Sequence, residues 1–278
     1  RSLRSLASWV TSIGSATADL PASEQRTLRA RSRDAFRGQP IARAALTRCR
    51  TNIVGTGLMC RPSVDAAALG IEQEAADEIN ALLDSRFTMW TDDALQCDWE
   101  ATSDFYGLQG LSLLSAMLSG DVFAITPEQM RIGGTSALKI QLIEADRVSN
   151  KDDACDTSGM VDGIVINDGV PVGCWIRSTH PGDNLTSTEL ARWDYYAMFG
   201  TETGRRRVLH IWNDKERPGQ VRGAPYLAPI LEPLMQVARY GNAELMAAVV
   251  SAMLTVFIEK TAEQLDGDGN PIPALPET

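Results

Sequence analysis

The side chains best suited to covalent chemistry in this 278-residue chain are its five cysteines and two histidines. Cys174 and His210 each fall in a strand-like run, and a thiol nucleophile and its base can meet in space from distant positions. The pair therefore keeps a cysteine-dependent hydrolase open as an alternative. A buried thiol and a hydrogen-bonded strand histidine explain the same two residues more simply.

Metal-binding patterns are weak. The chain has no HxxxH, HExxH or CxxC arrangement, so no zinc site is expected. An EF-hand-like spacing occurs at Asp266, Asp268, Asn270 and Glu277. Pro271 stands where that loop needs glycine, which argues against calcium. The acidic run NKDDACD (150–156) is typical of a solvated loop. We expect no metal.

Nucleotide and cofactor motifs are absent as well. The chain contains no GxxxxGK[ST] loop, no GxSxG and no GxGxxG. We therefore expect no cofactor, no catalytic residue and no enzymatic activity.

Charge is distributed unevenly along the chain. Residues 1–50 hold ten arginines against three acids, whereas the remainder holds 16 basic residues against 33 acids, for a net charge of -10. This asymmetry fits either a solvated surface or complementarity between the basic head of one subunit and the acidic body of the next. An acidic body argues against tight nonspecific DNA binding, which depends on many basic contacts to phosphate.

The elements that would position these residues follow from periodicity. Helices are expected over ASEQRTLRARSRDAFRG with Ser23 as N-cap, IARAALTRCRTNIVG after Pro40, IEQEAADEINALLDSRFTMW with one apolar stripe, and DFYGLQGLSLLSAMLSG. Short strands are expected at 121–126, 138–144, 163–168, 170–178 and 207–213, and Asn167-Asp168-Gly169 marks a hairpin.

A long helix follows, apolar on every side over 245–258, which predicts burial in a core or beneath neighbouring subunits. That run is too short for a membrane span. The fold class is α+β: a helical amino-terminal part, an antiparallel β meander, then a long apolar helix.

Two groups of arginines invite a functional interpretation. Arg26, Arg29, Arg33 and Arg37 recur every three or four residues and share one helical face, which could meet an acidic neighbour, DNA or solvent. The other group lies in the loop RPGQVRGAP (217–225), where Pro218-Gly219 is a turn and Gly223 precedes a helix start. Arg217, Gln220, Arg222 and Gly223 could form an intersubunit or strand-to-helix clamp, or an intrachain corner.

Five blocks in order carry a family resemblance: RSRDAFRGQPIARAALTRCRTNIVGTGL, DFYGLQGLSLLSAMLSGDVFAI, LKIQLIEADRVSN, GIVINDGVPVGCWIRSTHPGD and RVLHIWNDKERPGQVRGAPYLAPILEPL. Together they resemble the lambda-type family of tailed-phage portal proteins, over about residues 25 to 258. Family members are longer, so the chain resembles their amino-terminal portion.

The resemblance implies a non-enzymatic, ring-forming subunit, dodecameric in phages, at the capsid vertex of the virion, assembled in the bacterial host cytoplasm. Its implied partners are copies of itself, the terminase large subunit, capsid and head-completion proteins, and double-stranded DNA passing through the channel, with no membrane. A capsid scaffold that never contacts DNA is the other alternative.

The implied domains are an arm (1–22), a wing-like α+β domain (23–225), a long helix toward the stem (226–260) and a Pro/Gly-rich loop or linker (261–278).

Overall fold

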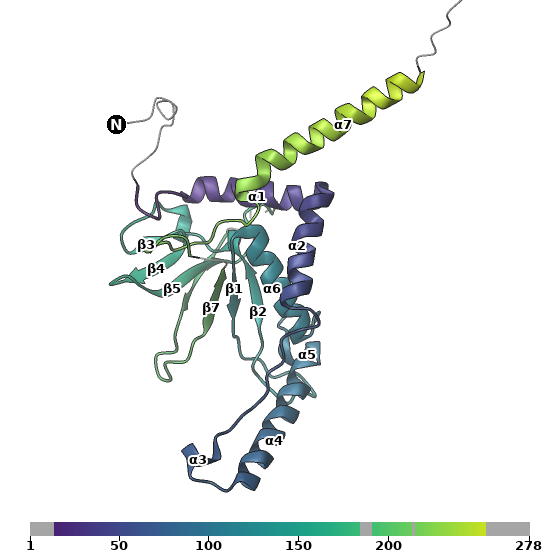
Figure 1. The fold of residues 1–278 in the computed structure, drawn as a ribbon. Helices are drawn as coiled ribbons and strands as arrows, with labels where there is room; N and C mark the ends of the chain where they lie inside the picture. The colour runs from purple at the N-terminus through teal and green to yellow at the C-terminus, as the bar shows by residue number, and fades with distance from the viewer. Residues whose placement is uncertain (1–13, 184–190, 213–214, 254–278) are drawn as a thin grey trace, which may run out of the picture. The chain divides into compact units, whose positions relative to one another are not determined.

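A computed structural model describes residues 14–183, 191–212 and 215–253. These residues form an α+β fold with helices at the amino-terminal end and antiparallel sheets after them, as the sequence predicted (Figure 1). The chain divides into two compact units, Arg1–Leu234 and Met235–Thr278. The EF-hand-like pattern and the predicted linker lie outside the described residues.

Helices make up the first part of the larger unit. They are α1 (Ala22–Gly38), α2 (Pro40–Ile53), α3 (Ala66–Leu69), α4 (Gln73–Thr91), α5 (Ala94–Cys97) and α6 (Phe105–Ser119). Aspartates cap three of them, since the side chains of Asp65, Asp93 and Asp104 accept hydrogen bonds from the first-turn amides of α3, α5 and α6. The prediction of Ser23 as the N-cap of α1 is wrong, because Pro21 takes that position. Its fixed φ suits the entry into a helix, although it offers no capping oxygen.

The strands form two separate antiparallel sheets rather than one meander. They are β1 (Asp121–Ile125), β2 (Gln141–Glu144), β3 (Met160–Val161), β4 (Ile164–Asn167), β5 (Val170–Arg177), β6 (Trp193–Ala197) and β7 (Val208–Trp212). One sheet has the order β3-β4-β5-β6 and is a meander, and the other has the order β2-β1-β7. The predicted hairpin turn is confirmed, because Asp168 and Gly169 have φ of 48° and 78° between β4 and β5. The single-meander prediction is wrong because β7 returns to pair with β1.

Two hydrophobic cores hold the larger unit together. The first lies between the sheets and contains Phe123 of β1, Ile143 of β2 and Ile164 of β4, all essentially inaccessible to solvent. The second joins α1, α2 and α6 through Leu46 and Met117, among others. Each fully buried side chain of this size contributes about 1.5–3 kcal/mol. One core therefore lies within the sheet layer and the other within the helical layer, and α6 packs against β1 between them.

Helices α3 and α4 form an arm that extends past the ends of the sheets (Figure 1). The predicted helix is present in α4, but its apolar stripe faces solvent. Ile79, Leu82 and Leu83 are 39%, 53% and 46% exposed, and only Ala76 and Thr91 are buried in this helix. The carboxyl-terminal end of the stripe does pack within the chain, because the rings of Phe87 and Trp90 lie 5.8 and 5.3 Å from the ring of Phe105.

The predicted long helix corresponds to α7 (Leu231–Met253). It begins later than expected because Pro225–Ile230 form turns, including the 3-10 turn η4 (Ala228–Ile230). Glu232, Arg239 and Glu244 lie among its apolar residues, so the long apolar helix of the predicted fold class is not found. Of the run predicted to be apolar on every side, 245–258, the structure describes 245–253, and these residues are exposed. Residues 254–260 lie outside the described part. Among the described helices, none combines the length and hydropathy needed to cross a bilayer.

Candidate functional site

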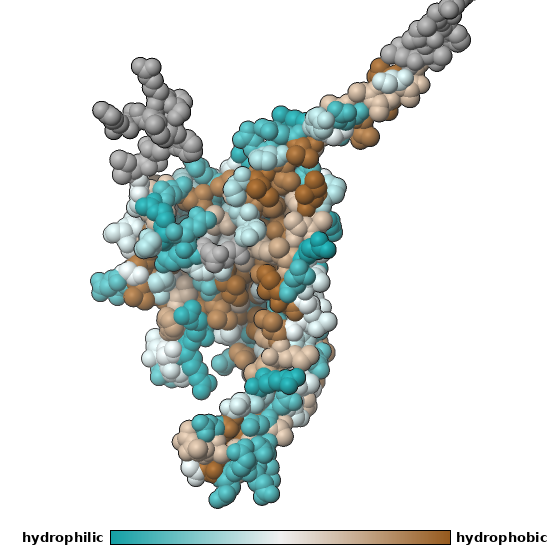
Figure 2. All heavy atoms as spheres, in the orientation of Figure 1, coloured by the Kyte–Doolittle hydropathy of each residue, from teal (hydrophilic) through white to brown (hydrophobic). Residues whose placement is uncertain are grey.

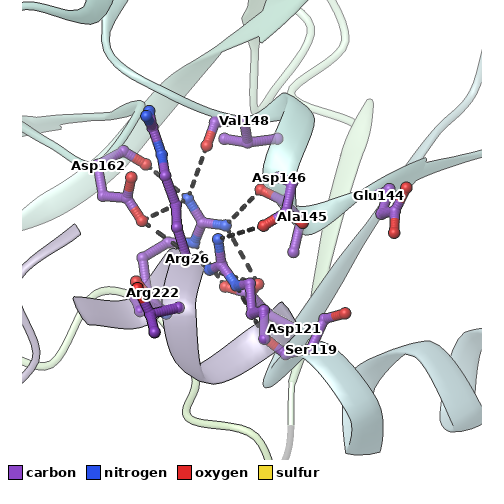
Figure 3. Close-up of polar contacts among 12 residues, drawn as sticks. Arg26, Ser119, Asp121, Glu144, Ala145, Asp146, Val148, Asp162 and Arg222 are labelled. Carbon is purple, nitrogen blue, oxygen red and sulfur yellow. Dashed lines mark hydrogen bonds and ion pairs between the residues drawn. The ribbon is translucent and has the colours of Figure 1, made fainter. Parts of the chain in front are cut away.

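A cluster of five buried charged residues joins the helical layer to the sheets. Its members, which we call the ionic joint, are Arg29, Asp121, Asp146, Asp162 and Arg222. They come from α1, the first residue of β1, the 3-10 turn η2 (Ala145–Arg147), the turn before β4 and the loop 217–223. Figure 3 shows Asp121, Asp146 and Asp162 arranged around the guanidinium of Arg222. Burial of charge is tolerated only where each group is paired and hydrogen-bonded.

Asp121 is the centre of the joint. Its Oδ2 accepts hydrogen bonds from Arg222 Nε at 2.6 Å and from the Gly223 amide at 3.3 Å, and it lies 3.0 Å from His210 Nε2. Its Oδ1 accepts from Arg222 Nη2 at 3.2 Å and from Arg29 Nη2 at 3.4 Å. With a side-chain exposure of 0%, the carboxylate is solvated by protein alone.

Arg222 uses each of its three nitrogens within its own chain. Besides Asp121, it donates to three backbone carbonyls: Val148 at 3.0 Å, Asp162 at 2.6 Å and Ala145 at 2.9 Å. Its Nη1 also lies 3.0 Å from the Asp162 carboxylate. The planar guanidinium can satisfy carbonyls and a carboxylate together, which lysine could not do. Arg222 is therefore a strand-to-helix clamp inside the chain, and it is not exposed to a neighbour.

Arg29 reaches the joint from α1. It donates to the Ser119 carbonyl at 3.0 Å, to Asp146 at 3.3 Å and to Asp121 at 3.4 Å, with its side chain 1% exposed. These bonds tie α1 to the end of α6, to η2 and to the start of β1. Removing one partner from such a set typically costs about 3–5 kcal/mol, because the others are left buried and unpaired.

The pKa shifts follow from this geometry. Burial alone would raise the pKa of the Asp121 carboxyl, but the charge of Arg222, the His210 hydrogen bond and the charge of Arg29 outweigh it and hold this pKa well below its usual range. Burial likewise works against the charge of Arg222, yet Asp121 and Asp162 raise its pKa above the usual value. Burial and repulsion by Arg222 lower the pKa of Arg29. The surroundings therefore favour the charged forms of Asp121 and Arg222.

Two glycines allow the loop and the helix to meet backbone to backbone. A Cβ on Gly223 would lie 2.1 Å from the Gly120 carbonyl oxygen, and one on Gly120 would lie 2.2 Å from the Gly223 carbonyl oxygen. Gln25 of α1 seals the contact by donating to the Gly223 carbonyl at 2.7 Å. Glycine is needed at position 223 of RPGQVRGAP because only glycine leaves room for this contact.

The remaining residues of the loop organise it locally. Gln220 Oε1 accepts from the amides of Glu216 and Arg217, and Gln220 Nε2 donates to the Arg222 carbonyl at 3.0 Å. Arg217 is half exposed and pairs with Asp19. In this chain the loop is a corner whose contacts are intrachain.

The four arginines predicted to share a helical face separate into different environments. Arg29 is buried, and Arg33 bonds Glu144 at 2.9 Å and also Asp146. Arg26 pairs with Asp153 at 3.0 Å on the surface, and Arg37 is exposed. The prediction of one outward, partner-facing basic face is wrong for Arg29, because acids from distant segments lie against it.

The geometry does not support the hypothesis of a cysteine-dependent hydrolase that uses Cys174 and His210. Burial raises the pKa of the Cys174 thiol to about 12, although Arg222 opposes the shift. His210 is stacked between Phe123 and Trp212, with ring centroids 4.2 and 5.1 Å away, and its Nε2 faces Asp121. Cys174 is therefore a core thiol of β5, and His210 is a structural partner of the joint.

Two acidic residues and a histidine have the spacing of a metal site. Glu144, Asp146 and His180 place donor atoms within 4.8 Å of one another. Arg33 already donates to both carboxylates, so a cation would have to displace a guanidinium. In the run 150–156, Asp156 accepts from Asn150 at 2.8 Å and from the Asp162 amide at 2.8 Å, which indicates a structural turn.

Comparison with known proteins identifies the chain. A sequence profile described as phage portal protein, lambda family, matches residues 2–274. The chain belongs to this family. It is 26% identical over 255 residues to a probable portal protein of Halomonas phage phiHAP-1, covering 89% of this chain and 46% of that protein. It is 23% identical over 232 residues to portal protein B of Escherichia phage lambda, covering 83% of this chain and 42% of that protein.

These comparisons confirm the resemblance carried by the five sequence blocks. The chain spans about half the length of these curated relatives. Three members of the portal chain's ionic joint escaped sequence reasoning: Asp121, Asp146 and Asp162. A usable signal existed for one of them, since Asp121 opens a strand and aspartate is rare at such positions without a partner.

Proposed function

We propose that this chain is part of a ring-forming portal subunit at the capsid vertex of a phage virion, and that the ring is the conduit through which double-stranded DNA enters and leaves. The observation that carries the proposal is the family match over residues 2–274. By family resemblance the ring is a dodecamer, assembled in the host cytoplasm, and its partners are the terminase large subunit and the capsid and head-completion proteins.

Charge supports a conduit. Residues 51–278 hold 16 basic residues against 33 acids, so most of this surface repels the DNA backbone. Each basic contact to phosphate would have to be broken as the duplex advances. A channel that lets DNA slide is best built with few such contacts.

The ionic joint supports a mechanical role in place of catalysis. Its charges are used to fasten α1, α6 and the loop 217–223 to the sheets, and its pKa shifts stabilise the charged forms of Asp121 and Arg222. We propose that residues 23–225 form the outer wing of the subunit, with 1–22 as an arm. The helix within 226–260 would lead toward the stem, followed by the linker 261–278.

The test is the assembly state of the intact protein. Negative-stain electron microscopy and native mass spectrometry should show closed rings with an axial opening. A species that remains monomeric at every concentration would refute the proposal. Rings that assemble into capsids without any role in DNA passage would favour the scaffold alternative.

A further inference from the structure

Helices α4 and α2 carry faces that fit each other but do not meet within the chain. On α4, Ile79, Leu82, Leu83 and Met89 are 39%, 53%, 46% and 56% exposed. Their offsets from Ile79 are three, four and ten residues, which puts them along one side of the helix. An amphipathic helix normally turns such a stripe toward a core, so this exposed part of the stripe lacks a partner.

The exposed side of α2 carries small side chains where the stripe of α4 carries large ones. Ile41, Ala44, Ala45 and Arg48 are all exposed and follow the i, i+3, i+4, i+7 spacing of one helical face. The two alanines, which have the smallest side chains of this face, stand between the larger Ile41 and Arg48. Helices pack by placing the ridge of one into the groove of the other, and small residues allow close approach. The leucine pair of α4 is of the right kind to pack over the two alanines of α2.

Charge separates along the same two segments. From Phe36 to Val64 the chain contains five arginines and no acid, and from Asp65 to Ser85 it contains six acids and no lysine or arginine. Arg37, Arg43 and Arg48 are exposed in the first segment, and Glu74 and Glu78 are exposed in the second. Among the described residues, no ion pair joins α2 to α4. Arg48 lies on the α2 face described above and Glu74 and Glu78 lie beside the exposed stripe of α4, so the two faces are opposite in sign.

We propose that α4 of one subunit packs against α2 of a second copy of this chain. This inference rests on the proposed ring, and it names the surfaces that build it. Because the two faces belong to different helices, the contact is heterologous: each copy offers α4 to one neighbour and α2 to the other. Contacts of this type propagate around a closed ring, whereas a two-fold pair would end at a dimer. Figure 2 shows the hydrophobic side chains over α2 and α6, and the mixed surface of the arm.

A charge-swap series in the intact protein tests the pairing. Variant A carries Glu74→Lys and Glu78→Lys, variant B carries Arg48→Glu, which changes the arginine of the described α2 face, and variant AB carries all three changes. A control carries Glu100→Lys and Glu202→Lys, which changes net charge as variant A does but on other exposed positions. Native mass spectrometry then measures the protein concentration at which rings form.

Wild type and control should assemble alike, while A alone and B alone should need roughly 10- to 100-fold more protein, since attractions become repulsions at every interface. AB should recover, and so should a mixture of A with B, because each then meets a neighbour of opposite charge. Recovery in the mixture also shows that both variants are folded.

Other outcomes overturn the inference in distinguishable ways. If the wild type forms no ring, the proposed function fails and this inference falls with it. If rings form and variant A assembles as well as the wild type, only the α4–α2 pairing is refuted. Loss in A and B without recovery in AB or the mixture also refutes the pairing. Normal assembly of B with impaired DNA passage would assign the α2 face to DNA.

Cross-linking gives an independent readout that does not depend on charge. Leu83→Cys combined with Ala45→Cys, placed in one chain, should produce a ladder of dimers, trimers and larger species on mild oxidation of the rings. Each single substitution, Leu83→Cys or Ala45→Cys, serves as its control and should give no ladder beyond any that the five native cysteines give in the wild type. Rings that yield no ladder with the double variant would count against the pairing.

Discussion

Replacing Asp121 by asparagine tests whether the ionic joint fastens the helices to the sheets. The two carboxylate oxygens receive Arg222, Arg29 and the Gly223 amide, and one also faces His210. Asparagine keeps the shape but supplies one acceptor oxygen and puts an NH₂ group against donors. Two guanidinium groups then lose their shared counter-charge inside the protein.

The cost should be about 3–5 kcal/mol of unfolding free energy, the range for removing one partner of a buried ion pair. For a cooperative unit of this size, each kcal/mol shifts the melting temperature by roughly 2–4 °C, so the expected loss is about 6–20 °C. Urea denaturation followed by tryptophan fluorescence, and a thermal melt followed by circular dichroism, measure both quantities.

The matched control is Asp153→Asn, which removes the partner of Arg26 from a pair whose side chains are 44% and 47% exposed. Surface pairs contribute about 0–1 kcal/mol, so this variant should melt close to the wild type. If Asp121→Asn is no more destabilising than Asp153→Asn, the joint does not hold the fold together and the reasoning is refuted.

The pH dependence carries a second signature of Asp121. Its folded pKa lies below the unfolded value of about 3.9, so between the two the unfolded chain binds more protons. The stabilisation is complete above the unfolded pKa and is lost as the pH falls below about 4 toward the folded pKa. The wild type should lose stability more steeply on acidification than Asp121→Asn, and parallel curves would contradict the assignment.

The remaining predictions concern packing, thiol reactivity and assembly. Gly223→Ala should destabilise by about 2–4 kcal/mol, because its Cβ would lie 2.1 Å from a backbone oxygen. Gly38→Ala, which has open space around it, should be nearly neutral in the same urea titration, and equal effects would sink the packing argument. In the folded protein at neutral pH, iodoacetamide should label Cys60 and Cys155, which are exposed, far faster than Cys174, as read by mass spectrometry of peptides. Rapid labelling of Cys174 would revive the hydrolase. In the intact protein, ring assembly should fail in each single charge swap of α4 or α2 and return in the double swap.

Local sequence signals were sufficient for the longer helices α1, α2, α4 and α6 and for the central hairpin. Pro40 opens α2 because a proline in the first turn loses no hydrogen bond. Asp168 and Gly169 turn the chain between β4 and β5 because both accept positive φ. The strand β3 has two residues, too few for any alternation to register, and it was missed for that reason.

The direction in which a side chain points could not be read from local pattern. Arg29 sits on a helix at a spacing that suggests a wet face, and it is buried because Asp121, 92 positions later, lies against it. The apolar stripe of α4 poses the converse problem, since its periodicity predicts burial and it is exposed in a single copy. In both cases the deciding partner is remote, either along the chain or in another molecule.

The Gln25 side chain is hydrogen-bonded to the Gly223 carbonyl, and their separation of 198 residues along the sequence also bears on how the chain folds during synthesis. At a translation rate of about 5–20 residues per second, roughly 10–40 s separate the emergence of the two from a ribosome. Arg29 meets Asp121 and Asp146 earlier in that interval, but Asp121 lacks the Arg222 guanidinium until the loop emerges. Nascent chains of this protein are then most vulnerable to aggregation and to chaperone capture just before the loop at 217–223 appears, and stalling the ribosome on either side of that point should reveal it.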